Sequence, residues 1–395
     1  MNKKTSVSQL LKQNMMLIVL VAIVVLGTIL TKGILIKPMN ISNLINQNAY
    51  IVILAVGMLL CILTGGNIDL AVGSTVALVG ACAGTFIITW GWNTYLSVIL
   101  CLLLGIAIGF WQGFWIAYVR IPAFIVTLSG QLVFRGLTLM MLKGLTISPF
   151  PENYMRLTTG FIGTADTRKT IALVVGIIVA IVFIIMQIKN RMNRKKKGYE
   201  LESLVATVVR SAIIVAVVLW LFYMLSKYRG IPTVMITLAI VLLVYSFITS
   251  KTVMGRHLSA IGGNEKAAKL SGVNTNMMLF LAYVNMSFLA AVAGIAFSAR
   301  LNGASPQAGT GFELDAIGSC YIGGASAYGG VGTVGGALIG ALIMGILNNA
   351  MSILGISQDA QQMVKGLVLL AAVAFDVISK QKVQIPFFSK LKIKK

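Results

Sequence analysis

The chain has 395 residues, of which 58% are hydrophobic and only 11% are charged, and its mean hydropathy is +0.92. A soluble globule of this length needs a larger share of charged residues to coat its surface, so the composition predicts a polytopic membrane protein instead. The apolar runs are about 18 to 24 residues long, which suits membrane-spanning helices, and they lack the alternation typical of an outer-membrane barrel.

Basic residues produce the formal charge of +22, and they gather in a few places. They precede the first apolar run, fill a loop at 189–205 and close the chain at 380–395. Because positively charged loops stay in the cytoplasm, this pattern predicts that both termini, loop 189–205 and the polar loop 251–275 are cytoplasmic. No base-reading module accompanies these clusters, so we expect no nucleic-acid partner.

The predicted fold is all-α, with about twelve membrane-spanning helices and a range of ten to twelve. We expect residues 1–14 to form a cytoplasmic N-terminus, 15–379 the membrane domain and 380–395 a basic cytoplasmic tail. In chain order, the candidate spans lie at 15–36, 49–64, 70–88, 95–118, 122–141, 170–188, 206–226, 232–250, 276–298, 312–329, 335–354 and 363–379. Twelve crossings, an even number, place both termini on the same side of the membrane. The charge rule, applied independently, predicts the same.

One connection between two predicted spans is unusually polar and reads GRHLSAIGGNEKAAKLSGVN, from 255 to 274. Asn264 fits a helix N-cap, Glu265 and Lys269 are spaced i,i+4 within the helix-forming run EKAAKL, and Gly272 fits a helix stop. A helix of about two turns is too short to be stable alone. The stretch is therefore either an ordinary ordered loop or an element that docks to a cytoplasmic partner.

Polar side chains in or beside the apolar runs are candidates for a translocation path. Asp69 follows Asn67 in LTGGNIDLAVGS, where a carboxylate either caps the next helix or belongs to the path. Five amide side chains lie deeper in predicted spans: Gln112, Gln131, Asn285, Asn348 and Asn349. Each either lines a path for a polyhydroxylated solute or forms hydrogen bonds between helices.

A third polar motif, GFELDAIGSCYIGGAS, carries Glu313 and Asp315 ahead of a glycine-broken apolar segment at the predicted outer face. The two carboxylates either cap that helix or contact a partner outside the membrane.

The sequence does not favour enzymatic activity. GGVGTVGGAL contains a GxGxxG pattern but lacks the preceding strand of a dinucleotide site, so close helix packing is expected there. There is no P-loop and no cluster of catalytic or metal-ligating residues, so we expect neither catalysis nor a cofactor or metal in this chain.

The three polar motifs resemble those of ABC importer permeases of the ribose/galactose/xylose branch. GRHLSAIGGNEKAAKLSGVN is similar to the cytoplasmic loop of that branch, GGNIDLAVGS to its Gly-Ile-Asp-Leu-Ser-Val-Gly segment, and GFELDAIGSCYIGGAS to a third signature. The likeness runs from Ile41 to Val377, nearly the whole chain. Within the branch, GFWQGFWIAYVRIPAFIVTLSG, ISPFPE and the two additional spans around 170–225 resemble the multiple-monosaccharide subgroup.

The resemblance implies an ATP-driven monosaccharide importer in the plasma membrane of a bacterium. Two permease copies would form the pathway, separate cytoplasmic ATPase subunits would bind ATP and Mg, and an extracytoplasmic sugar-binding protein would deliver the sugar, contacting Glu313 and Asp315. The helix at 264–270 would be a coupling helix received by the ATPase. Residues assigned to coupling by the resemblance are Gly255, Arg256, Gly262, Gly263, Asn264, Glu265, Ala267, Ala268, Lys269, Ser271 and Gly272.

Within that loop, the resemblance implies a tight entry at Gly262 and Gly263 and ionic contacts from Glu265 and Lys269. An ion- or proton-coupled secondary transporter of small polar solutes is the alternative. Such a transporter needs ionisable groups within the membrane, and the predicted spans offer little beyond Asp69, Arg135 and Asp376.

Overall fold

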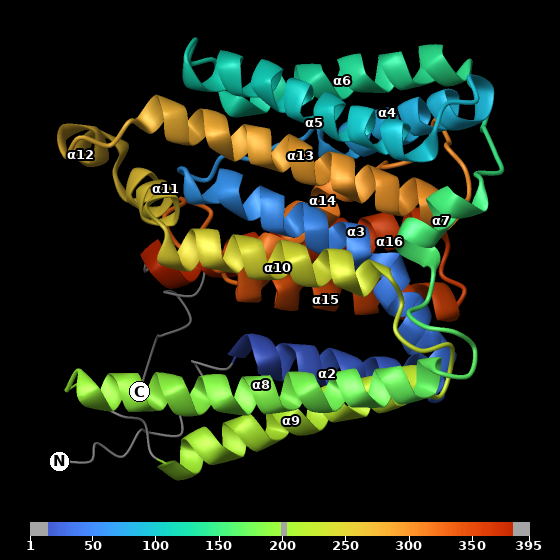
Figure 1. Cartoon of the computed structure of the whole chain (residues 1–395). Coiled ribbons are helices and arrows are strands. Elements are labelled where there is room, and N and C mark those ends of the chain that lie inside the picture. Colours follow the sequence, from blue (N-terminus) through green and yellow to red (C-terminus); the bar gives the residue numbers. More distant parts are fainter. Residues whose placement is uncertain (1–14, 199–203, 382–395) are drawn as a thin grey trace, which may run out of the picture.

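The computed structural model describes residues 15–198 and 204–381, and in that part of the chain the regular elements are helices. Two isolated bridges, Ile147–Ala304 and Phe161–Pro232, join loops there. Figure 1 shows long helices lying side by side with roughly parallel axes. The all-α prediction is confirmed.

The helices vary widely in length. In chain order they are α2 (Met15–Leu30), η1 (Ile34–Ile36), α3 (Pro38–Leu63), α4 (Val72–Gly84) continued by η2 (Thr85–Thr89), α5 (Thr94–Ala117), α6 (Ala123–Leu142), α7 (Glu152–Thr159), α8 (Arg168–Lys196), α9 (Leu204–Ser226), α10 (Val234–Lys251), α11 (Val253–Gly263), α12 (Glu265–Leu270), α13 (Thr275–Leu301), α14 (Phe312–Ile322), α15 (Val334–Ile353) and α16 (Gln358–Gln381).

Ten of the described helices are long and apolar enough to cross a membrane, at the lower bound of the predicted range. The predicted span 312–329 falls short, because it contains the 11-residue α14, whereas the described part of the helix in span 15–36 is α2, Met15–Leu30. The chain turns at Gly33 and Gly324, whose φ angles of 81° and 82° lie in the left-handed region that glycine adopts readily. A hydropathy scan does not detect such turns.

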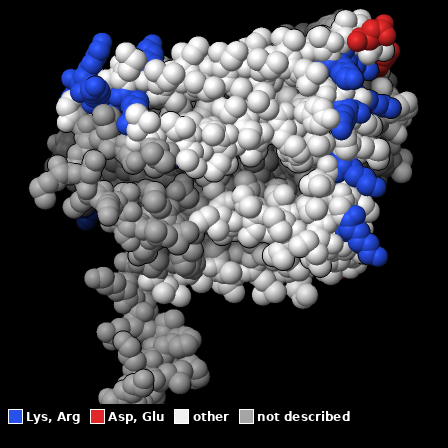
Figure 2. Space-filling view, turned by 90° about the horizontal axis from the view of Figure 1, so that it is seen from below, with Lys and Arg blue, Asp and Glu red and all other residues white. Residues whose placement is uncertain are grey.

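The two ends of the bundle carry the charged residues. Figure 1 places α12 at the same end as the C-terminal end of α8, and α7 at the opposite end. In Figure 2, basic side chains gather at both ends, and the visible surface between them is uncharged. We call these the α12 end and the α7 end. That the α12 end faces the cytoplasm stays a prediction from the charge rule.

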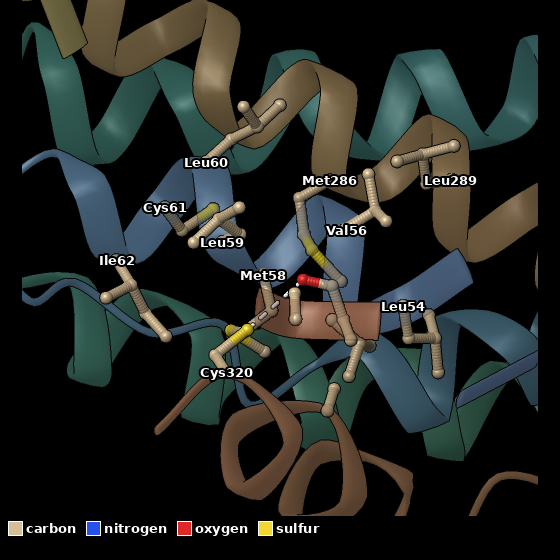
Figure 3. Close-up of a cluster of buried hydrophobic side chains, with 14 of the residues drawn as sticks. Leu54, Val56, Met58, Leu59, Leu60, Cys61, Ile62, Met286, Leu289 and Cys320 are labelled. Carbon is tan, nitrogen blue, oxygen red and sulfur yellow. Dashed lines mark hydrogen bonds between the residues drawn. The ribbon is translucent and has the colours of Figure 1, made fainter. Parts of the chain in front are cut away.

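The core of the bundle forms around α3 and α13. Leu54 and Leu59 of α3 are fully buried, and α13 packs against α3, α4 and α5. Figure 3 shows Met286 of α13 and Cys320 of α14 in one cluster with side chains of α3. A Cβ at Gly109 of α5 would lie 2.6 Å from the Cα of Val284, so α5 and α13 approach at backbone distance.

The α8–α9 hairpin lies beside this core. Ala172, Gly176 and Ala180 of α8 are buried at four-residue spacing, and a Cβ at Gly176 would lie 2.6 Å from the Cβ of Phe222 in α9. The hairpin meets the rest of the bundle around Ile41 of α3. Only 17% of the α8 span and 11% of the α9 span are buried, which leaves most of both helices for lipid.

Candidate functional site

The polar loop after α10 folds into two short helices. Thr252 caps α11, and the Asn264 side chain accepts a 3.0 Å hydrogen bond from the backbone N–H of Ala267, which starts α12. Gly272, with φ at 85°, follows the helix where an αL residue is needed. The short helix over EKAAKL and its predicted N-cap are thus confirmed.

The glycines of this loop have different environments. A Cβ at Gly262 would lie 2.1 Å from the Leu63 carbonyl oxygen and 2.2 Å from the Gly330 nitrogen, and a Cβ at Gly255 would lie 2.2 Å from the Thr249 carbonyl oxygen. No atom lies within 4 Å of a Cβ at Gly263. Close packing therefore requires glycine at 255 and 262, whereas the space around 263 is open.

Glu265 pairs with a residue that sequence reasoning did not select. Its Oε1 lies 2.7 Å from a guanidinium nitrogen of Arg120, in the turn between α5 and α6. Arg120 also donates to the Thr275 hydroxyl at 3.3 Å and to the Asn276 side-chain oxygen. The i,i+4 spacing favoured Lys269, but Lys269 is exposed and no ion pair joins it to Glu265 among the described residues. The sequence did contain one signal for this pair: Arg120 is a basic residue at the end of predicted span 95–118, on the same predicted side of the membrane as Glu265.

Most of α12 faces outward. Ala268 is its buried residue, whereas Leu270 is 90% exposed, the highest value among the large hydrophobic residues described. Figure 1 places α12 at the extremity of the molecule. Leu270 was not among the predicted coupling residues; those that are exposed are Arg256, Gly263, Asn264, Glu265, Ala267, Lys269, Ser271 and Gly272. An apolar side chain beside two exposed lysines, Lys266 and Lys269, thus projects from the α12 end.

Two of the path candidates meet in a buried hydrogen-bonded chain. Asp69 Oδ1 accepts from the backbone N–H of Ala71 at 2.8 Å and from Gln112 Nε2 at 3.5 Å. Ser287 of α13 in turn donates to Gln112 Oε1 at 3.3 Å. All three polar side chains are at most 1% exposed, so they join the loop before α4 to α5 and α13 inside the protein. Asn67 is partly buried and hydrogen-bonds within its own turn, to Thr64.

A second polar group joins α6 to α14. Gln131 Nε2 donates to Glu313 Oε1 at 3.5 Å. Gln131 lies on α6, one turn before Arg135. Arg135 donates to the carbonyl oxygens of Pro306 and Ala308, both at 2.7 Å. Glu313 and Gln131 are partly exposed, so this group is accessible near the loop that precedes α14.

Asp315 belongs to a third group, which is buried. Its two carboxylate oxygens lie 2.9 and 3.1 Å from Lys365 Nζ of α16. Asp315 is 1% exposed and so has almost no surface for an external partner in this structure. Asn285 lies apart and accepts a 2.8 Å hydrogen bond from the Tyr245 hydroxyl. The path candidates therefore fall into separate groups rather than one lining.

A small cavity connects one path candidate to the short helix. Its volume is about 160 Å³, and its polar lining includes Thr64, Asn67, Arg120, Glu265 and Thr275. No group of side chains suited to hold a metal ion occurs among the residues described.

A bundle of apolar helices with buried polar groups and one protruding short helix has the architecture of a membrane transport protein. Comparison with known families matches residues 40–186 and 147–373 to the family described as "Branched-chain amino acid transport system / permease component". The chain belongs to this permease family and is a multi-pass protein of the bacterial inner membrane.

Relatives cover almost the full length. The chain is 38% identical to the xylose transport system permease protein of Escherichia coli K12, over 93% of this chain and 92% of that protein. It is 39% identical to the protein of the same name from Haemophilus influenzae, over 93% and 96%. It is 35% identical to the ribose import permease protein of E. coli K12, over 93% and 94%. No solved structure matches.

Proposed function

We propose that this chain is the permease subunit of an ATP-driven importer that carries a monosaccharide into the cell. The observation that carries the proposal is similarity to xylose and ribose permeases over 93% of the chain, α12 included. The chain translocates and does not hydrolyse ATP, because its sequence has no P-loop.

The energy source in this proposal is a separate cytoplasmic ATPase that binds ATP and Mg. Leu270, Lys266 and Lys269 form the exposed part of α12 that docks in an ATPase cleft, with Ala268 holding the helix to the permease. For ATP hydrolysis to drive transport, the ATPase must bind the two conformations of the permease with different affinities.

The sugar path in this proposal passes between two copies of the chain and uses the amides and carboxylates of the three polar groups. These side chains offer both donors and acceptors, as a polyhydroxylated solute needs. The path residues are Asn67, Asp69, Gln112, Gln131, Asn285 and Asn348. Because Asp69 and Gln112 are buried here, the path opens only when helices move apart.

An extracytoplasmic sugar-binding protein delivers the monosaccharide at the α7 end. Of the two predicted contact residues, Glu313 is the more accessible, because it is partly exposed whereas Asp315 is buried. Asp315, paired with Lys365, contributes to this contact only by positioning α14.

Two buried carboxylates, Asp69 and Asp315, the second of which pairs with the partly buried Lys365, favour one second candidate, a secondary transporter driven by an ion gradient. The test reconstitutes the chain in proteoliposomes with and without the copurified ATPase and sugar-binding protein. Uptake of labelled xylose, ribose, galactose and glucose is measured at saturating ATP. The importer requires uptake that disappears without the ATPase, whereas ATPase-independent uptake under an ion gradient supports the secondary transporter.

A further inference from the structure

The connection between α12 and the membrane helices is sparse. Ala268 is the buried residue of α12, and the cavity beside Glu265 separates it from Asn67 and the end of α3. The ends of α12 are covalently joined to α11 and α13 through Asn264 and the turn at Ser271–Asn274. A helix with so little buried surface depends on specific contacts for its orientation.

Arg120 supplies those contacts from another part of the chain. Its guanidinium contacts Glu265 at the start of α12, and Thr275 and Asn276 at the start of α13. Its φ of 65° is uncommon for a residue with a side chain. One planar group thus joins three segments: the α5–α6 turn, α12 and the first turn of α13.

The exposure of the pair argues against a mainly stabilising role. The Arg120 and Glu265 side chains are 41% and 46% exposed, and ion pairs at such positions add little to stability. Their geometry, in contrast, fixes how α12 lies against the α5–α6 turn, because the guanidinium fork binds in a defined orientation.

The α5–α6 turn leads directly to the buried polar groups. α5 carries Gln112, which binds Asp69, two turns before Arg120, and α6 carries Gln131 and Arg135 on the other side of the turn. A displacement of α12 that is transmitted through Arg120 therefore reaches both helices that hold these groups.

We propose that Arg120 is a positioning residue that transmits movement of α12 to the α5–α6 turn through its ion pair with Glu265. This inference rests on the proposed function, in which α12 docks to the ATPase. Arg120 touches neither the sugar nor ATP; it makes α12, α13 and the α5–α6 turn move together.

The test exchanges the two charges in the reconstituted complex. Arg120→Glu and Glu265→Arg each place like charges together, whereas the double variant restores an ion pair with reversed polarity. We expect each single variant to lower sugar uptake per ATP hydrolysed by about fivefold or more, and the double variant to recover most of that ratio. Arg120→Lys keeps the charge but loses the fork, so an intermediate ratio is expected. Arg194→Glu, a reversal of an exposed charge at the same end on α8, is the matched control and leaves the ratio unchanged.

A second measurement does not depend on the sugar. Amide hydrogen exchange of 264–272 in nanodiscs is expected to be faster in both single variants and to return to the wild-type rate in the double variant. Unchanged exchange and coupling in the single variants, or a double variant no better than either single one, overturns the positioning role. A wild-type complex that imports none of the sugars refutes the proposed function separately, since the exchange data still decide whether Arg120 positions α12.

Discussion

Helices α3 and α8 are both long and apolar, yet 78% of the α3 span is buried inside the protein and only 17% of the α8 span. The more apolar of the two is α8. In a bilayer, lipid chains solvate apolar side chains as well as protein does, so hydropathy does not decide which helix becomes central. The difference comes from the neighbours: α3 is surrounded by helices that approach through small residues, whereas α8 packs mainly on α9.

The largest effect is expected where two backbones meet in the core. Gly109→Leu places a side chain where a Cβ already lies 2.6 Å from Val284 Cα, so α5 and α13 must separate at a cost of about 3 kcal/mol or more. Gly136→Leu on α6, with no atom within 4 Å of its Cβ, is the matched control. Thermal unfolding in nanodiscs measures both, and equal melting temperatures would contradict the close approach.

The second effect concerns the buried polar chain of the core. Asp69→Ala leaves the N–H of Ala71 and the amide of Gln112 without their acceptor and is expected to cost about 1–3 kcal/mol. Asp69→Asn keeps an acceptor oxygen and restores most of the stability. Sugar uptake by this variant then separates the alternatives: retained uptake indicates a cap, and lost uptake with retained stability indicates a role in the path.

A smaller effect is expected from side-chain truncation in the hairpin. Leu289→Ala in the core of α13 removes a fully buried side chain and is expected to cost about 2–5 kcal/mol. Leu219→Ala in α9 changes a side chain that is 39% exposed and is expected to cost about 1 kcal/mol or less, because lipid contacts that face of the hairpin. Paired unfolding curves test this order, and a Leu219 variant as unstable as the Leu289 variant would show that the hairpin is part of the core.

The smallest effect on stability is expected at the exposed tip of α12. Leu270→Ser changes a side chain that is 90% exposed, so the free energy of unfolding should change by less than about 0.5 kcal/mol. Affinity for the ATPase, measured by copurification and by titration in nanodiscs, should nevertheless fall. Unchanged binding would remove Leu270 from the docking surface.

Local signals predicted much of the fold and part of the candidate site. The apolar runs located the ten long helices, and Asn264 and Gly272 marked the ends of α12, because capping depends on nearby backbone groups. The shortness of α14 was missed, since the glycine turn after it, at Gly324, lies within apolar sequence. The partner of Glu265 was also missed, because the i,i+4 rule describes an isolated helix and Arg120 is 145 positions away in the chain.

The sequence by itself determined that the chain is a helical membrane protein with a polar loop ending in a short capped helix, because hydropathy and capping are local properties. Tertiary structure alone decided that α3 is central and α8 peripheral, that Asp69 meets Gln112, and that Asp315 meets Lys365 rather than the surface. These outcomes depend on which helices pack together. In a bilayer, backbone approach and polar pairing select those partners, and residues distant in the chain supply both.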